Sequence, residues 1–151
     1  MTTPARSLEQ VRTRIRESFA RQSFMQHLGA ELVRIDAGVV EIALTRHDLL
    51  LQQHGFVHAG VISSILDSAC GYAALSLMDE DAGVLSVEFK TNLLAPASGE
   101  HFIATGTVLK SGRTLSVCRG EAFSLEGDAR RLIAAMQATM MAVRGRDGVS
   151  N

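Results

Sequence analysis

The chain has 151 residues, of which 46% are hydrophobic and 21% are charged, a balance that suits one globular domain with its own core and excludes a disordered or fibrous protein. Its formal net charge of −1 gives no bulk attraction for nucleic acid or for an anionic membrane. Six Phe, one Tyr and no Trp are too few aromatic residues for a base-stacking surface, so we expect no nucleic-acid partner.

The N-terminal segment predicts an amphipathic helix over about residues 7–24. Apolar residues recur along it at intervals of three and four, and Ser7 and Gln10 have the spacing of an N-terminal capping box. The segment is rich in charges and lacks the apolar stretch of a secretory signal peptide. Gly29 then ends the helical pattern.

Two strands and a second helix are predicted next. Residues 30–36 and 39–45 alternate or are rich in β-branched side chains, and the Ala-Gly pair between them is a hairpin-type turn. Residues 46–58 are polar and contain glycine, which predicts a loop. Residues 59–77 form a long apolar run, which predicts the second helix.

The remainder of the chain predicts strands separated by turns. Segments that begin "VLSVEF", "EHFIAT", "RTLSVC" and "RRLIAA" are divided by Ser-Gly and Gly-Asp pairs. The alanines and methionines of the last segment would suit a helix, but its length and its position favour a long strand. Residues 145–151 are predicted to be a disordered tail.

These elements predict an α+β fold in which one long apolar helix lies among five or six mostly antiparallel strands. We expect a single domain over residues 1–151, with its core at about 28–143. A helix that is apolar on nearly every face must be covered on all sides, and one curved sheet cannot do this. A second copy of the sheet could, so a homodimer is expected.

Two further features bear on location. Cys70 and Cys118 have apolar or β-branched neighbours and form no CxxC pair, so we interpret them as small core residues rather than as a disulfide or a zinc site. Residues 59–78 are about long enough to cross a membrane, but Asp67 near their centre costs about 3 kcal/mol on insertion scales. A buried helix in a cytoplasmic protein is therefore expected.

Asp67 places a carboxylate in the middle of this predicted apolar helix. Ser64, Asp67, Ser68 and Gly71 have helical spacing and form one narrow stripe of small or polar residues. Asp67 could be structural, hydrogen-bonded to the backbone or to a nearby serine. The stripe could equally form a channel through which water or a substrate reaches Asp67 as a base or a nucleophile. The pattern leaves both interpretations open.

The histidines do not form a site with Asp67 within one chain. His58 precedes the helix by one residue and Asp67 by nine, which places them about 13 Å apart along the axis. If both serve one site, they must meet across a subunit interface. His47 and His54 are expected on the surface or in turns, and the three histidines lack the spacing of a metal site.

The start of the second helix offers the complementary half of an acyl-transfer site. Gly55, Ala59 and Gly60 are small enough to let a ligand approach free backbone N–H groups, where the helix dipole adds positive charge. Such donors can stabilise the negative charge that develops on a carbonyl oxygen. A carboxylate on another helix would then supply or activate the attacking group.

At this point "HGFVHAGVISSILDSACGYAA" resembles the signature of the hotdog-fold acyl-CoA thioesterases, in particular the thioesterases of the phenylacetic-acid pathway. His58, Gly60 and Asp67 match that signature in type and spacing. "SVEFKTNLLAPA" is similar to the family's strand after the central helix, and "GRTLSV" to a later strand with a basic turn. The resemblance covers about residues 29–143. It implies a long helix wrapped by a five- to six-stranded antiparallel sheet, an obligatory homodimer that often forms tetramers, and active sites at the dimer interface.

The resemblance also implies roles for single residues. Asp67 would be the general base or nucleophile, and the backbone N–H of Ala59 next to Gly60 would polarise the thioester carbonyl. His58 would support that site from the partner chain. Ser86 would orient the nucleophile or water.

Three further positions are implied at the edge of this site. Gln52 falls where relatives have Asn or Gln to position water or substrate, and Lys110 and Arg113 lie in a turn that could meet the phosphates of CoA. The family's His-Gly-Gly is His-Ala-Gly here, and Gln52 is longer than Asn by one methylene. Both departures affect the size and pose of the substrate more than the type of reaction.

The sequence thus predicts hydrolysis of a medium-chain or aromatic acyl-CoA to a free acid and CoA. No cofactor is expected, since CoA is part of the substrate, and no metal. One alternative is a non-catalytic protein that binds acyl-CoA or lipid. Another is an enoyl-CoA hydratase or dehydratase, which ranks last because Asp67 lies two turns too deep in the helix for that chemistry.

Overall fold

The structure, a computed structural model, describes residues 7–149 of the chain. Within that range it contains three α-helices, one short 3-10 helix and six β-strands. In chain order the elements are α1 (Leu8–Ala20), α2 (Ser23–Leu28), β1 (Glu31–Asp36), β2 (Val39–Thr45), η1 (Asp48–Leu50), α3 (Ala59–Leu75), β3 (Gly83–Leu93), β4 (His101–Ser111), β5 (Leu115–Glu126) and β6 (Ala129–Val143).

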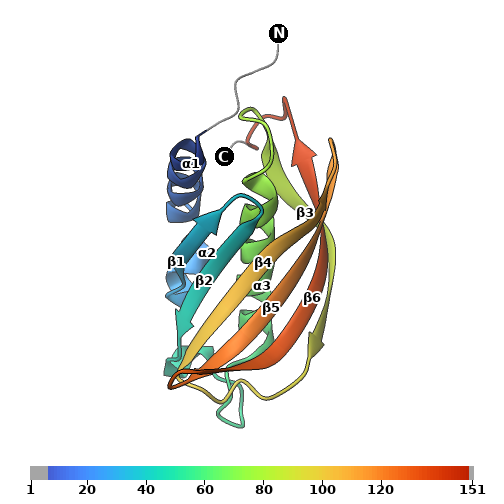
Figure 1. Cartoon of the computed structure of the whole chain (residues 1–151). Helices are drawn as coiled ribbons and strands as arrows, with labels where there is room; N and C mark the ends of the chain where they lie inside the picture. Colours follow the sequence, from blue (N-terminus) through green and yellow to red (C-terminus); the bar gives the residue numbers. More distant parts are fainter. Residues whose placement is uncertain (1–6, 150–151) are drawn as a thin grey trace.

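The six strands form one antiparallel sheet that curves around α3 (Figure 1). Their order across the sheet is β1-β2-β4-β5-β6-β3, so β3 lies at an edge although it is third in the chain. The predicted α+β architecture is confirmed. The ambiguous last segment is strand β6, in which alternate residues from Met136 to Ala142 are buried, as expected for a strand with one face on a core.

The N-terminal helix requires a correction, because the single helix predicted over about 7–24 is two helices. The capping box of Ser7 and Gln10 starts α1 as predicted, but α1 ends at Ala20. Gln22 is extended, with φ −79° and ψ 91°, and α2 starts directly after it. Because the chain turns at this point, α2 buries the side chains of Met25 and Leu28 in the core.

The central helix α3 lies directly against the sheet, because two glycines face it. Gly106 on β4 and Gly120 on β5 are cross-strand partners. A Cβ atom on Gly106 would overlap the backbone of Ala69 and lie 2.5 Å from the amide nitrogen of Cys70. Helix and sheet therefore approach each other more closely here than side chains would permit.

Coverage of α3 by its own chain is more complete than expected. Eleven of its residues are buried within the described part of one chain: Val61, Ile62, Ile65, Leu66, Ala69, Cys70, Gly71, Tyr72, Ala73, Ala74 and Leu75. The curved sheet provides most of this cover, and Ser18 and Phe19 of α1 add contacts with Tyr72 (Figure 1). The apolar character of the helix is therefore not an argument for a dimer.

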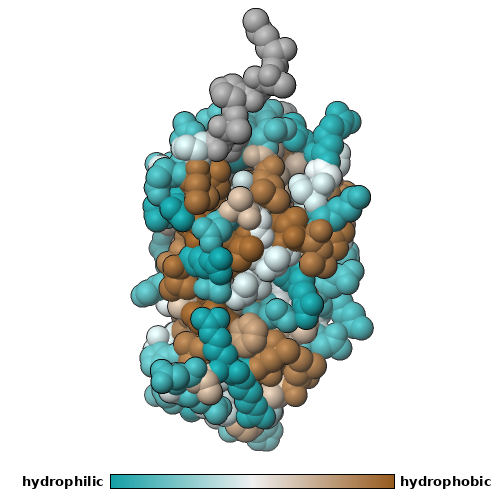
Figure 2. All heavy atoms as spheres, in the orientation of Figure 1, coloured by the Kyte–Doolittle hydropathy of each residue, from teal (hydrophilic) through white to brown (hydrophobic). Residues whose placement is uncertain are grey.

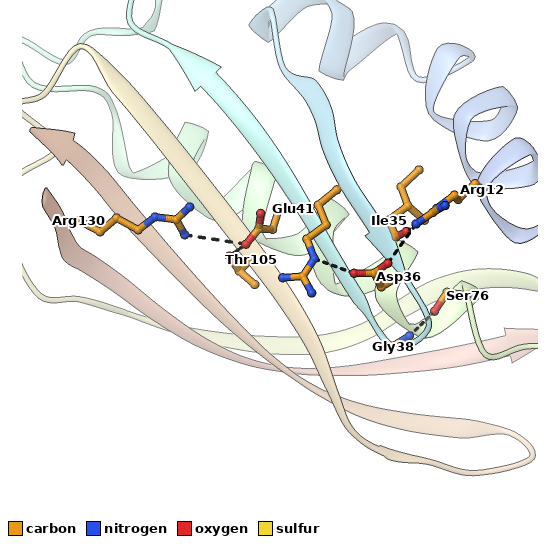
Figure 3. Close-up of polar contacts among 9 residues, drawn as sticks. Arg12, Ile35, Asp36, Gly38, Glu41, Ser76, Thr105 and Arg130 are labelled. Carbon is orange, nitrogen blue, oxygen red and sulfur yellow. Dashed lines mark hydrogen bonds and ion pairs between the residues drawn. The ribbon is translucent and has the colours of Figure 1, made fainter. Parts of the chain in front are cut away.

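Polar contacts fasten the N-terminal half of the chain to this core (Figure 3). Arg12 on α1 donates from Nε to the carbonyl oxygen of Ile35 at 3.0 Å and pairs with Asp36 at 3.2 Å. The turn between β1 and β2 donates the N–H of Gly38 to Ser76 Oγ at 2.7 Å, just beyond the end of α3. These contacts hold α1 and the first hairpin against the central helix.

The cysteines are free thiols in the core, as predicted. Cys118 Sγ donates to the carbonyl oxygen of Cys70 at 3.6 Å, across the contact between β5 and α3. Burial raises the pKa of both thiols, that of Cys118 to about 11.

Two further observations concern the ends of the chain and the helices. Of the predicted disordered tail, residues 145–149 form a turn closed by Val149 N–H and the carbonyl oxygen of Arg146 at 3.1 Å, and residues 150–151 lie outside the described range. Within residues 7–149, no helix combines the length and the apolar character needed to cross a membrane.

Candidate active site

Asp67 lies half-buried in the middle of α3, at a cavity of about 360 Å³. Most of the predicted stripe faces this cavity, since Ser68 and Gly71 line it together with Asp67. Ser64 does not line it, and its hydroxyl donates to the carbonyl oxygen of Gly60 at 2.6 Å. The carboxylate is therefore accessible to a small molecule from the side of the helix that carries the small residues.

Ser86 is the partner of Asp67. Its hydroxyl donates to Asp67 Oδ1 at 2.6 Å, from strand β3 to helix α3. The register of β3 against β6 shifts between Ser86 and Glu88, a bulge of the kind that reorients a side chain beside a functional site. The structure thus brings together two residues that the sequence placed in one site.

His58 caps the N-terminus of α3. Its ring nitrogen Nδ1 accepts the N–H of Gly60 at 2.9 Å, so His58 is the N-cap and the N–H of Gly60 is occupied. A neutral imidazole that accepts at Nδ1 carries its proton on Nε2, which can donate to a ligand. No acceptor among residues 7–149 takes up the N–H of Ala59. Two donors are thus available at this helix terminus.

A second cavity, of about 550 Å³, adjoins this helix start. Gln52, His58 and Ala59 line it together with mainly apolar residues of the segment after β3. Gln52 Oε1 accepts the N–H of His54, which fixes the side chain in the loop before α3. Gln52 is therefore a neighbour of His58 and Ala59, and not of Asp67.

The predicted residues consequently fall into two groups within one chain. Asp67 and Ser86 share the first cavity, whereas Gln52, His58 and Ala59 share the second. This separation agrees with the nine-residue spacing of His58 and Asp67 along one helix. Each chain therefore presents the carboxylate of Asp67 and the donors at the start of α3 in different cavities.

The remaining predicted positions lie outside both cavities. Lys110, near the end of β4, and Arg113, in the following turn, are exposed, and neither lines either of these two cavities. The carbonyl oxygen of Arg113 accepts from Arg144 Nη1 at 3.2 Å. His47 precedes the 3-10 helix as its N-cap and His54 is exposed in the loop, as expected for turn and surface residues.

Sequence reasoning missed the far side of the Asp67 cavity. Ser18, Arg21 and Gln22, from the end of α1 and the junction with α2, line it together with Tyr72 of α3. A signal was present: Ser18 and Gln22 continue the helical spacing of the apolar face of α1 with polar side chains.

With this geometry in view, comparison with known proteins identifies the family. Residues 54–129 match the model of the thioesterase superfamily. This range contains Asp67 and Ser86 but not Gln52. YigI of Escherichia coli strain K12, a medium/long-chain acyl-CoA thioesterase, is 27% identical over 133 residues, which cover 78% of this chain and 84% of YigI.

Solved structures of similar proteins support the same assignment. A thioesterase family protein from Silicibacter pomeroyi is 50% identical, with a TM-score of 0.87 over 89% of this chain and 99% of that chain. The PaaI protein of the Escherichia coli phenylacetic acid degradation operon has a TM-score of 0.83 at 19% identity, over 92% and 98% of the two chains, and so shares the fold. The chain therefore belongs to the thioesterase superfamily and is a thioester hydrolase with the hotdog fold.

Proposed function

We propose that the protein hydrolyses an acyl-CoA with a medium-chain or aromatic acyl group, at a composite site between two protomers. The observation that carries the proposal is the hydrogen bond from Ser86 to Asp67 in a cavity that a small molecule can enter. The similarity to YigI, a medium/long-chain acyl-CoA thioesterase, supports the medium-chain part of this proposal.

In the proposed reaction, the thioester carbonyl oxygen binds at the N-terminus of α3 of one protomer. The N–H of Ala59 and the Nε2–H of His58 are placed to stabilise the negative charge that develops on this oxygen. Gln52 lines the same cavity and would orient the substrate or the water. The helix dipole adds to the effect of these donors.

Asp67 of the other protomer completes the site. Ser86 occupies Oδ1, and no group among residues 7–149 bonds to Oδ2, which can take a proton from water. The water oxygen then forms a bond to the carbonyl carbon, the C–S bond breaks, and the CoA thiolate takes up a proton. Direct attack by Oδ2 would instead give a mixed anhydride that water hydrolyses.

A homodimer is supported by the edge strand β3. Leu85, Val87 and Phe89 on this strand are 38%, 53% and 45% exposed, and an unpaired apolar edge favours pairing with another strand. Apolar patches also interrupt the hydrophilic surface on the face that Figure 2 presents.

Pairing of β3 with its copy would extend the sheet and bring Ser86 and Asp67 near the interface. We propose that two such dimers form a tetramer.

Two basic residues lie outside both cavities. Lys110 and Arg113 are exposed cations, and we propose that they contact the CoA phosphates. The absence of a cofactor and of a metal, and the cytoplasmic location, stay predictions.

The variant Asp67→Asn tests the proposal. It preserves the shape of the side chain but removes the base, so kcat for acyl-CoA hydrolysis should fall on the order of a hundredfold or more. Release of free CoA thiol measures this. Ser64→Ala is the control, because Ser64 lies on the same helix outside the cavity. Unchanged turnover in Asp67→Asn would remove Asp67 from the reaction, and binding of acyl-CoA without thiol release in the wild type would favour the non-catalytic alternative.

A further inference from the structure

The junction between α1 and α2 lines one side of the cavity beside Asp67. Gln22 stands at this junction as the extended residue between the two helices. Its amide bridges two turns of α3: Nε2 donates to the hydroxyl of Tyr72 at 2.7 Å, and Oε1 accepts from Ser68 Oγ at 3.4 Å. One side chain therefore ties the N-terminal helices to the wall of the cavity.

Tyr72 is the centre of this contact. Its hydroxyl also pairs with Ser18 Oγ at 3.1 Å, and both residues are buried, at 3% and 6% exposure. Its ring packs edge-on against Phe19 of α1, with the centroids 5.9 Å apart. Polar contacts shielded from water in this way are strong and difficult to open without replacement. We call Gln22 and Tyr72 the clamp.

The clamp lies beyond the carboxylate in the direction of the helix C-terminus. Tyr72 follows Asp67 by five residues, which corresponds to about 7.5 Å along the axis. Both line the same cavity, and its volume of about 360 Å³ is near the lower end of the range for small-molecule sites. A substrate held at Asp67 thus has a limited space before it meets the clamp.

We propose that the clamp is the end wall of the acyl-binding cavity and sets the longest acyl group that the enzyme accepts. The inference rests on the proposed acyl-CoA hydrolysis at Asp67. An acyl chain that fits the cavity leaves Gln22 in place. A longer chain must displace it and leave the buried hydroxyl of Tyr72 without one of its partners. Selection by length is therefore built into the attachment of α1 and α2 to α3.

Two variants test the wall with straight-chain acyl-CoAs of stepwise increasing length. Tyr72→Phe removes the hydroxyl but retains the ring against Phe19, and Gln22→Ala removes the bridging amide at a half-buried position. For each, we expect the ratio of kcat/KM for long to short acyl groups to rise tenfold or more, mainly through a lower KM for the long substrates.

The matched control is Arg12→Ala. It breaks contacts of α1 with Ile35 and Asp36 and touches neither the clamp nor the cavity, so the length ratio should stay at the wild-type value. A rise of the ratio in this control as large as in the clamp variants would show that loosening of α1 anywhere is sufficient, and would overturn the clamp as the specific wall.

A binding measurement separates this inference from the proposed function. Dissociation constants of non-hydrolysable thioether analogues of the same acyl-CoAs do not depend on turnover. A wild type that binds them but hydrolyses no acyl-CoA contradicts the proposed function alone, and tighter binding of long analogues to the clamp variants would still support the wall. Length ratios that match the wild type in both clamp variants overturn it, and so does a failure of every form of the protein to bind any analogue.

Discussion

The hydroxyl of Ser86 reaches Asp67 from the sheet, not from the helix that carries the carboxylate. Its hydrogen bond at 2.6 Å therefore holds one carboxylate oxygen at a fixed place relative to β3. Ser86 is a positioning residue in this scheme, since it acts on the substrate through Asp67.

Ser86→Ala should lower kcat about tenfold with little change in KM, since a hydrogen bond to a charged group contributes about 1.5–3 kcal/mol and part of this is replaced by water. Ser86→Thr retains a hydroxyl and should restore most of the rate. Steady-state kinetics of both variants measure the effect. An equal loss of kcat in Ser86→Thr and Ser86→Ala would assign the loss to the strand rather than to the bond.

The buried thiol of Cys118 makes stability depend on alkaline pH. Burial raises its pKa from 9.0 to about 11, so the folded state holds the proton more tightly than the unfolded chain. This contribution is present below about pH 9 and is lost as the pH rises through about 11. The free energy of unfolding should fall over this interval, and it should fall less in Cys118→Ala. Urea denaturation at several pH values measures this, and parallel curves for the two proteins would contradict it.

Single residues differed in how far the sequence could identify them. Asp67 and Ser86 could be placed because an acid in an apolar helix is unusual and because the surrounding motif resembles a known family. Gln22 and Tyr72 could not, since they are 50 positions apart and neither has an unusual neighbourhood. Their pairing depends on how α1 folds back on α3, which local spacing does not record.

At the scale of elements, the position of α3 depends on the glycine pair beneath it. Gly106→Ala should destabilise the protein by about 3 kcal/mol, the upper end for overpacking, because the new methyl group meets the helix backbone. Gly120→Ala should cost less, about 1–2 kcal/mol, since its Cβ would lie 3.1–3.2 Å from Leu66 Cδ2, Cys70 Sγ and Met136 Cβ, and the first two can move. Urea denaturation gives both values, and equal losses would contradict this graded effect.

The same scale shows where local patterns are sufficient. Alternating or β-branched runs between turn residues predicted the strands, with length and position deciding for β6, and the apolar run predicted α3, which ends two residues before the predicted position 77. The break between α1 and α2 escaped because Arg21 and Gln22 are good helix formers. The chain leaves the helix there because this buries Met25 and Leu28 and lets Gln22 donate a hydrogen bond to the hydroxyl of Tyr72.

At the scale of the whole molecule, the proposed dimer connects the two half-sites with the exposed edge strand β3. In the proposed dimer, β3 carries Ser86 on one side and forms the subunit contact. Separation of the protomers would leave each half-site intact but would remove the alignment of donor and carboxylate, to which catalysis of this kind owes much of its rate. Activity per protomer should therefore fall on dilution below the dimer dissociation constant.

A charge on the edge tests this directly. Val87→Lys should give a monomer with an intact fold and an activity at least a hundredfold lower, because a lysine on an edge strand opposes pairing. Leu109→Lys is the matched control: both residues lie at register shifts in their strands and are similarly exposed, at 53% and 59%, but Leu109 is on β4, inside the sheet. Light scattering and thiol release measure the outcome. An active Val87→Lys monomer would refute the composite site.

Tyr72 has one more consequence. It is the sole tyrosine in a chain without tryptophan, so all tyrosine emission of the native protein comes from one ring. That ring stands at the wall of the Asp67 cavity, with its hydroxyl bonded to Gln22. Excitation at the red edge of tyrosine absorption, where the adenine of CoA absorbs only weakly, would therefore report on the state of the cavity without a label. The molecule carries its own optical probe at the place where an acyl chain would end.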